Sequence, residues 1–427
     1  MLLTGTIMNG YAESLYTNLW YLSPAFRQEF SRDERQKFID RYGYRKRIVE
    51  DRDDEGKVIA FGTVTDRVER RERVIGNAPG VLPLLLLKHL LPLSVTLHKA
   101  DLAVDIPPCA EMVEGIEPED KLLAEYNALQ KALIEQLRED KYDEEKSGAL
   151  LGALAQLPAY FDLATKDTGN QEDGSYEIRY PESLGGGLVV RAESFPASAI
   201  LPKERWMLNT IESELKEDRN VLVFGWHTVL LPRLARLIEE NLGITAPILN
   251  PDKVGTRKRQ KWIDKEVVAR KRRVLITNPV CVQTGLNNLV YFASSIWMQN
   301  PTCNPVIKRQ ADGRIDRIGQ MSNTRIHFPI YAGTTQQYLH SLLMHKVAVS
   351  MSTDGLDAEA ALQAAGVVEN DGFTAFSVGR QLYEMIISGR EMPMLTKTKK
   401  LMSAPIETKA PLIVTENDLF EFAMSLG

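Results

Sequence analysis

The chain has 427 residues, 44% of them hydrophobic and 26% charged, and a formal net charge of −5 at pH 7. This length predicts more than one folded domain, and the negative balance argues against a uniformly basic nucleic-acid coat. Three widely separated cysteines have no metal or disulfide spacing, which favours a reducing cytoplasm and predicts no metal site. The apolar run Val81–Leu93 is short and contains Lys88, His89 and two prolines, so it predicts a buried helix and no membrane contact.

The first half of the chain gives few clear signals. Thr4-Gly5-Thr6 is typical of a turn, and a Leu- and Trp-rich helix is expected at 15–22. The segment 31–202 is longer than a linker, and its clearest element is a helix predicted over Glu119–Leu137.

Strands alternate with helices between 203 and 350. Apolar runs predict five strands, namely Val221–Trp226, a short one around Ile248, Val274–Thr277, Ala293–Met298 and Thr324–Tyr331. Helices are predicted between them, including one that stops at Gly243 and one that begins at Thr335. This order predicts an α/β fold with a parallel sheet covered by helices on both faces.

Ligands of such sheets bind beyond the carboxyl ends of the strands. The loops that carry Trp226, Asn278 and Thr284 are expected at this edge. Trp226 is either a stacking surface for a base or a cap on the core.

A basic stretch extends from Lys253 to Arg273, with ten Lys or Arg residues against Asp264 and Glu266. Arg257 and Lys258 in this stretch are candidates for contact with the phosphate backbone of DNA. The alternative is a solvated helix face, which is the usual reason for a run of charge.

Two arginines stand three residues apart in the segment Gln310–Gln320, on a helix predicted between Asn304 and Gly319. Gln310, Arg314 and Arg317 are spaced by four and then three residues, so they are expected to share one helix face. Two guanidinium groups side by side are suited to binding a polyphosphate.

The arginine segment also allows a plainer interpretation, in which Asp312 and Asp316 pair with the arginines of a surface helix. The rest of the chain favours the interpretation in which the two arginines bind a polyphosphate. Four blocks resemble, in the same order, the third, fourth, fifth and last motifs of the superfamily-two helicases in their Swi/Snf-like form, namely 2–22, Val221–Trp226, Val274–Asn287 and Gln310–Gln320.

The resemblance implies an ATP-dependent DNA translocase or helicase that follows duplex DNA through its phosphates. It implies a RecA-like parallel-sheet lobe, the helicase second lobe. The implied organisation is the end of a first RecA-like lobe at 1–30, a mostly helical Swi/Snf-type insertion at 31–202, the second lobe at 203–350 and a C-terminal helical extension at 351–427.

The resemblance also implies roles for particular residues. Arg314 and Arg317 would be arginine fingers that stabilise charge on the transferring phosphate. The other implied roles are nucleotide contact by Gln310, Gly285 and Asn287, DNA-phosphate contact by Thr277 and Thr284, and coupling of hydrolysis to lobe movement by Thr4, Gly5 and Thr6.

A motor of this kind binds ATP with Mg²⁺ on a glycine-rich phosphate loop and an acidic box, and neither pattern is found in the sequence. We therefore expect a first RecA-like lobe, in cis or in trans, to hold the magnesium ligands and to complete the site. The chain alone is expected to be inactive. The alternative is a non-catalytic module that binds DNA or a protein partner.

Overall fold

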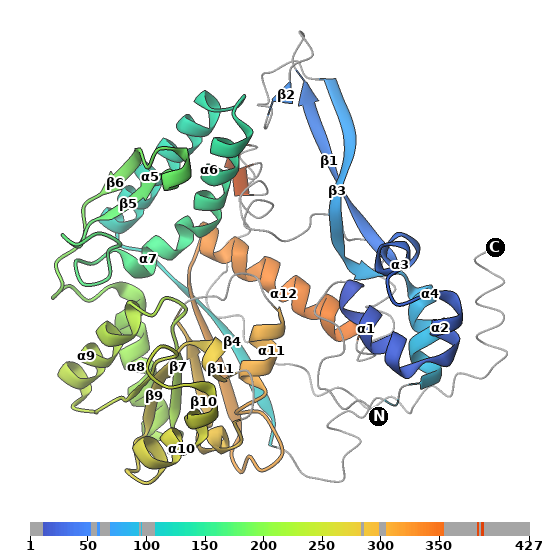
Figure 1. Cartoon of the computed structure of the whole chain (residues 1–427). Helices are drawn as coiled ribbons and strands as arrows, with labels where there is room; N and C mark the ends of the chain where they lie inside the picture. The colour runs from blue at the N-terminus through green and yellow to red at the C-terminus, as the bar shows by residue number, and fades with distance from the viewer. Residues whose placement is uncertain are drawn as a thin grey trace.

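The computed structural model describes residues 12–52, 58–59, 69–93, 95, 107–282, 286–298, 305–353, 382–383 and 386–387. Its largest feature is a six-stranded sheet, in the order β4-β11-β10-β7-β9-β8, whose neighbouring strands all run parallel (Figure 1). The strands are β4 (Cys109–Ile116), β7 (Val221–Phe224), β8 (Ile248–Leu249), β9 (Val274–Thr277), β10 (Ser294–Trp297) and β11 (Thr324–Tyr331). The five predicted strands and the parallel sheet are confirmed, and the lobe has the α/β, RecA-like architecture.

Helices cover both faces of the sheet because successive strand residues point to opposite sides. Val221 and Val223 of β7 are fully buried in a cluster with residues of α8 and α9, whereas Leu222 and Phe224 are fully buried in a second cluster with residues of α10 and α11. As predicted, α9 ends at Gly243, whose φ of 65° favours glycine. The flanking helices are α8 (Pro202–Lys216), α9 (Leu230–Leu242), α10 (Arg259–Ile263), α11 (Pro305–Asp312) and α12 (Thr335–Thr353).

The edge strand β4 was not predicted, because it falls in the segment 31–202 that we expected to be mostly helical. It pairs with β11 along its whole length, from Cys109 opposite Thr324 to Ile116 opposite Tyr331. Only Val113 of β4 is buried. An edge strand with one buried side chain lacks the apolar run that identifies a central strand, which explains why the sequence did not reveal it.

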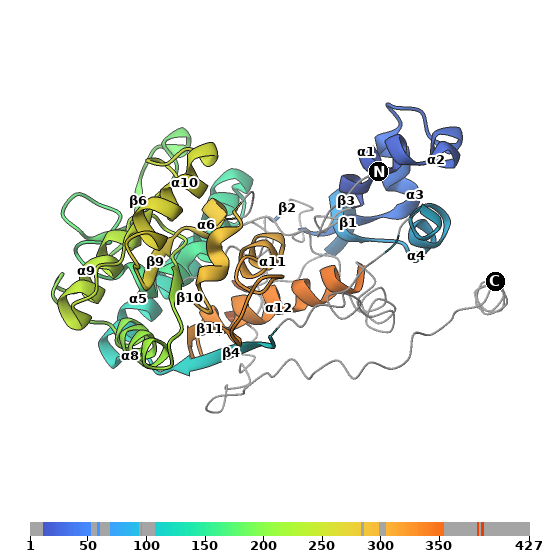
Figure 2. The same cartoon turned by 90° about the horizontal axis from the view of Figure 1, so that it is seen from below.

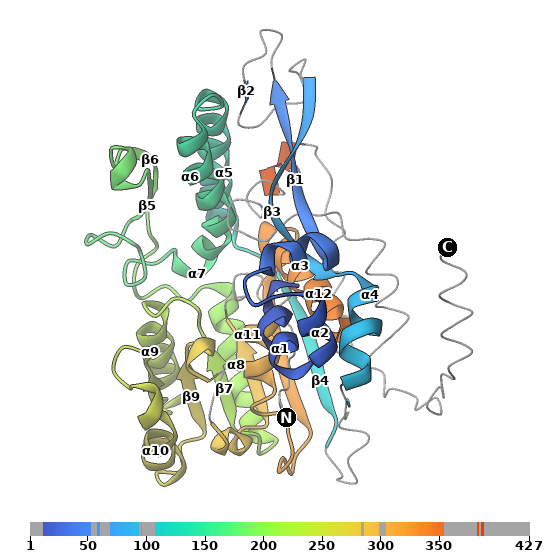
Figure 3. The same ribbon diagram turned by 45° about the vertical axis from the view of Figure 1, so that its right-hand side comes forward.

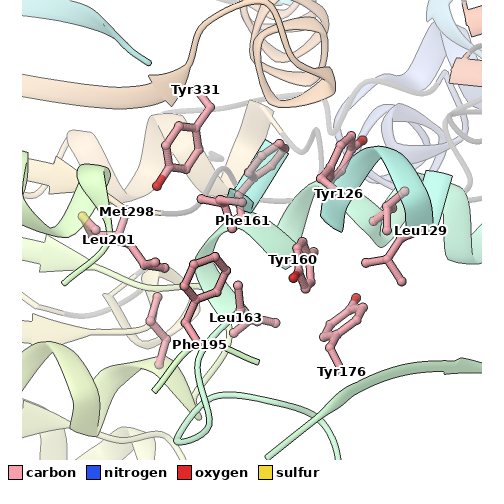
Figure 4. Packing of buried hydrophobic residues seen from close by; sticks show 14 of the residues in the cluster. Tyr126, Leu129, Tyr160, Phe161, Leu163, Tyr176, Phe195, Leu201, Met298 and Tyr331 are labelled. Atoms are coloured by element: carbon pink, nitrogen blue, oxygen red, sulfur yellow. The ribbon is translucent and has the colours of Figure 1, made fainter. Parts of the chain in front are cut away.

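A helical layer joins the sheet at its α8 and α9 face. Its elements are α5 (Asp120–Glu139), α6 (Glu144–Gln156), α7 (Tyr160–Leu163) and the hairpin of β5 (Tyr176–Arg179) and β6 (Leu188–Ala192). The Phe161 ring stacks on Tyr126 of α5 with centroids 4.3 Å apart and lies 4.9 Å from Tyr331 at the end of β11 (Figure 4). This aromatic contact fastens α5 and α7 to the sheet.

Beneath those rings lies a buried polar network. Lys203 Nζ lies 2.9 Å from Asp162 Oδ1, and Gln336 Nε2 donates to Asp162 Oδ2 at 2.9 Å. All three side chains are buried, and they come from α8, α7 and α12. Because each charge has a partner, the network ties three elements together without an isolated buried ion.

The N-terminal helices form a separate small core with β3 (Figures 1 and 2). Phe26, Phe30, Phe38 and Tyr42 are almost fully buried there, and Tyr16 meets three of these rings edge-on. The helices are α1 (Glu13–Leu22), α2 (Pro24–Glu29), α3 (Arg35–Tyr42) and α4 (Pro83–Leu85).

A long antiparallel hairpin rises from these helices (Figure 3). It consists of β1 (Gly43–Arg52) and β3 (Glu69–Val81), with the short β2 (Val58–Ile59) beside β1. With β4, β5 and β6, this hairpin adds strands that we did not predict to the segment 31–202, which also contains the helices α3 to α7. Its strands are rich in charge and lack apolar alternation, so period-two patterning could not detect them. In the described part of the chain, no helix is long and apolar enough to span a membrane.

Candidate functional site

The loops that follow β7 and β9 are joined at the carboxyl edge of the sheet. Asn278 Nδ2 donates to the main-chain oxygen of Trp226 at 2.5 Å, and Asn278 Oδ1 accepts from the Val280 N–H at 2.9 Å. Asn278 therefore holds the two loops in a fixed relation. As predicted, Trp226 and Asn278 lie at the same edge.

Thr277 is the last residue of β9 and is fully buried. Its hydroxyl donates to the main-chain oxygen of Leu249 at 3.0 Å. The hydroxyl proton is thus engaged inside the protein, and the side chain is out of reach of a DNA phosphate. We correct the expected role of Thr277 from a DNA contact to a link between β9 and β8.

The helix before the two arginines is shorter than predicted. α11 ends at Asp312, and the N–H groups of Arg314 and Ile315 then bond to carbonyl oxygens three residues back, at 3.1 Å each. Such tight turns change the direction of the chain. Arg314 and Arg317 therefore do not continue the helix face that carries Gln310. Gln310 itself is half-buried on the last turn of α11.

The carboxylate of Asp312, the last residue of α11, fixes this end of the helix to the sheet. It accepts from Trp297 Nε1 of β10 and from the buried Lys308 Nζ, both at 2.9 Å. Lys308 Nζ also donates to Glu111 Oε1 of β4 at 2.9 Å. Asp312 therefore pairs with a lysine one turn back, which corrects the interpretation in which it pairs with the neighbouring arginines.

Both arginines reach the loop after β9. Arg314 Nε donates to the Val282 main-chain oxygen at 2.8 Å, and its Nη1 lies 3.5 Å from the Leu286 oxygen. Arg317 Nη1 donates to the same Leu286 oxygen at 3.3 Å and to Asn287 Oδ1 at 3.0 Å. The structure thus brings Arg314, Arg317 and Asn287 together, and the roles expected for them stay predictions.

Arg314 and Arg317 bring two like charges close together. Burial, followed by the nearby charge of Arg317, lowers the pKa of Arg314. Like charges held close together are relieved by an anion, so the arrangement favours binding of a phosphate group.

The basic helix, which we define as the consecutive helical segments Thr256–Lys258, α10 and Asp264–Val268, contacts the other side of the same loop. Arg259 Nη1 donates to the Cys281 main-chain oxygen at 3.0 Å, and Gln260 Oε1 accepts from the Asn287 N–H at 3.0 Å. Neither residue was predicted to take part in the site, because a basic run indicates a charged surface and gives no signal for contacts of this kind. The described parts of this loop, 279–282 and 286–290, are therefore bonded to α10 on one side and to the arginine segment on the other.

Arg257 and Lys258 are exposed on the short helical turn Thr256–Lys258, directly before α10. The basic stretch therefore divides into two parts. Arg259 is half-buried and structural, whereas the two residues before it face solvent, where a phosphate backbone could reach them.

Five predicted site residues lie outside the described residues, and their roles stay predictions. They are Thr4, Gly5, Thr6, Thr284 and Gly285. Among the residues that the structure describes, no three His, Cys, Asp or Glu side chains come together as metal ligands.

No family model matches the chain. A Xenopus tropicalis protein named SWI/SNF-related matrix-associated actin-dependent regulator of chromatin subfamily A-like protein 1 is 30% identical over 154 residues, which are 34% of this chain and 15% of that protein. The resemblance to Swi/Snf-like proteins is confirmed. The Xenopus laevis protein of the same name gives the same values, and this chain therefore spans only 15% of the length of both relatives.

Solved structures of ATPase domains are also similar to this chain. The Sulfolobus solfataricus SWI2/SNF2 ATPase core in complex with dsDNA has 19% identity and a TM-score of 0.42, over 68% of this chain and 56% of that one. The C-terminal part of the Fun30 ATPase domain has 16% identity and a TM-score of 0.41, over 60% of this chain and 99% of that one. The assignment of the fold rests on the strand order and the two buried faces of the sheet.

Proposed function

We propose that the chain is the C-terminal part of an ATP-dependent DNA translocase or helicase of the Swi/Snf-like kind. A first RecA-like lobe, in cis or in trans, would hold the phosphate loop and the acidic ligands of Mg²⁺. This chain would contribute Arg314 and Arg317 to the nucleotide site and a basic surface to the DNA track. The observation that carries the proposal is the position of these two arginines at the loop after β9, in a chain similar to Swi/Snf-related proteins.

Arg317 is suited to act as a finger. Among the described residues it is engaged through Nη1 alone, and it is half-buried. A guanidinium has five N–H donors in a fixed plane, so Nε and Nη2 can still donate to phosphate oxygens. Such a contact would stabilise the charge that develops on the transferring phosphate. Arg314 would raise the local potential while it also holds the loop.

The DNA track would pass over the exposed residues before α10. Arg257 and Lys258 are exposed there, and Arg259 fixes the helix behind them. Contacts of this kind neutralise phosphates without reading bases. We propose duplex DNA as the partner, bound with an affinity that falls steeply with salt.

The proposal is tested with an enzyme that contains this chain together with its first lobe. Arg317→Ala is expected to lower DNA-stimulated ATP hydrolysis by about a thousandfold or more, because an arginine finger has an effect of that size. Duplex-DNA affinity is expected to stay within a few-fold of the wild-type value. Near-normal turnover in the variant would overturn the finger assignment.

A non-catalytic module that binds DNA or a protein partner is the second candidate. The bonds of both arginines to main-chain oxygens favour it, since they would give the arginines a structural role without any nucleotide. Hydrolysis that is absent in every context, combined with salt-sensitive DNA binding, would support this candidate. Weak binding that does not depend on salt would point to a protein partner instead.

A further inference from the structure

We propose that Gln260 is a positioning residue that links DNA contact on the basic helix to the position of Arg317. The link passes through Asn287, whose N–H is bonded by Gln260 Oε1 at 3.0 Å and whose Oδ1 is bonded by Arg317 Nη1 at 3.0 Å. One residue of the loop thus holds the helix with its main chain and the arginine with its side chain. The inference rests on the proposed function, in which the helix meets DNA and Arg317 meets nucleotide.

The helix end of the link lies close to the exposed charges. Gln260 is half-buried and follows Lys258 by two residues and Arg257 by three. The helical turn that carries the two basic residues continues into α10 without a break. A shift of this turn when a phosphate binds must therefore move Gln260 with it, since a helix transmits displacement over a few residues as a rigid element.

A second contact makes the link rigid. Asn288 Nδ2 donates to Asp264 Oδ1 at 2.7 Å and to the Gln260 main-chain oxygen at 3.3 Å. Two consecutive loop residues, Asn287 and Asn288, are thus bonded to one stretch of the basic helix. The loop cannot rotate about a single hydrogen bond, and a movement of the helix displaces the acceptor of Arg317.

Arg259 does not carry this link. Its guanidinium bonds to main-chain oxygens of Val254 and Cys281, at 3.2 and 3.0 Å, which fixes the start of the loop. Gln260 instead bonds to the end of the loop, beside the acceptors of Arg317. Gln260 is therefore the side chain whose change interrupts the link and leaves the exposed basic residues in place.

The link is tested by hydrogen–deuterium exchange of the full chain, with and without a short duplex DNA of mixed sequence. In the wild type, DNA is expected to slow exchange near Arg257 and also in peptides that cover 286–290 and 314–320. Gln260→Met has a side chain of similar size without the acceptor, so it should keep the slower exchange near Arg257 and reduce the slowing in 286–290 and 314–320, where the bonds of Asn288 to the helix remain. Gln260→Glu keeps an acceptor oxygen and should restore the slowing of exchange in 286–290 and 314–320.

DNA affinity, unfolding midpoints and the pattern of exchange together test the proposed link. Equal DNA affinity and equal unfolding midpoints in wild type and Gln260→Met are expected, and they separate a positioning role from a folding defect. If DNA slows exchange in 314–320 of Gln260→Met as much as in the wild type, the link is overturned. It is also overturned if DNA binds the wild type but slows exchange only in the basic helix. A chain that binds no duplex DNA would overturn the proposed function and, with it, this inference.

Discussion

Arg314 and Arg317 share one acceptor, because the main-chain oxygen of Leu286 lies 3.5 Å from Nη1 of the first and 3.3 Å from Nη1 of the second. The two arginines differ in their other bonds. Arg314 also donates to the Val282 oxygen at 2.8 Å, whereas Arg317 reaches the Asn287 side chain. The pair therefore combines an arginine that holds the loop with one that is better placed to meet a ligand.

This difference predicts unequal effects on stability. Arg314→Met should lower the free energy of unfolding by about 1–3 kcal/mol, because the Val282 carbonyl then loses a charged donor in a half-buried place. Arg317→Met should cost less than about 1 kcal/mol, since its bonds lie nearer to solvent and are screened. Urea unfolding of the two variants measures the difference. Equal losses would show that both arginines are structural.

The buried Lys308 is predicted to be essential for the position of α11. Burial opposes its charge, but Asp312 and Glu111 outweigh this effect and raise the pKa of Lys308. Lys308→Met leaves those two carboxylates without their cation, so the free energy of unfolding should fall by about 3–5 kcal/mol. Denaturant unfolding measures this fall.

Two controls belong to that experiment. Lys261→Met changes an exposed lysine and should have little effect on the unfolding free energy. Adding Glu111→Gln and Asp312→Asn to Lys308→Met should recover part of the loss, because the unpaired charges are then removed. A loss below about 1 kcal/mol in the single variant would contradict the role of the network.

His327 of β11 is predicted to make stability depend on pH. Burial lowers its pKa, but the carboxylates of Glu114 and Glu214 outweigh burial and raise it above the ordinary value. Its Nε2 lies 3.3 Å from Glu214 Oε1. A raised pKa in the folded state means that the stabilisation is fully present below the unfolded pKa, about 6.5, and is lost as pH rises through the folded value.

The measurement is urea unfolding of wild type and His327→Gln on either side of neutral pH. Wild type is expected to lose stability from slightly acid to slightly alkaline pH, and the variant should lose less over the same interval. Arg219 and Arg325 also contact Glu214 and keep their charge throughout, so they do not contribute to the difference. The same pH dependence in both proteins would contradict the assignment to His327.

The exposed basic residues are predicted to set the salt dependence of DNA binding. Arg257→Ala and Lys258→Ala should each reduce the slope of log affinity against log salt by about 1, because each removes one phosphate contact. Lys131→Ala, an exposed lysine on α5, serves as the matched control and should leave the slope unchanged. Fluorescence anisotropy of a labelled duplex at several salt concentrations gives these slopes. An unchanged slope in both variants would place the DNA track elsewhere.

Five of the six strands of the central sheet could be predicted from the amino-acid sequence. The buried strands Val221–Phe224 and Val274–Thr277 could be read from continuous apolar runs, because strands covered on both faces need apolar residues at every position. The family resemblance implied nucleotide contact for Asn287 and finger roles for Arg314 and Arg317, and the structure bonds Arg317 to Asn287.

The hydrogen-bond partners of the site residues became known only from the three-dimensional structure. The sequence could not show that Thr277 turns inward or that Gln260 bonds to the Asn287 N–H, because hydrogen bonds between distant segments leave no local pattern. Strand β4 and the hairpin of β1 and β3 were hidden for a related reason. The hairpin strands are rich in charge and β4 has a single buried residue, so pairing with a distant strand, and not local propensity, makes them strands.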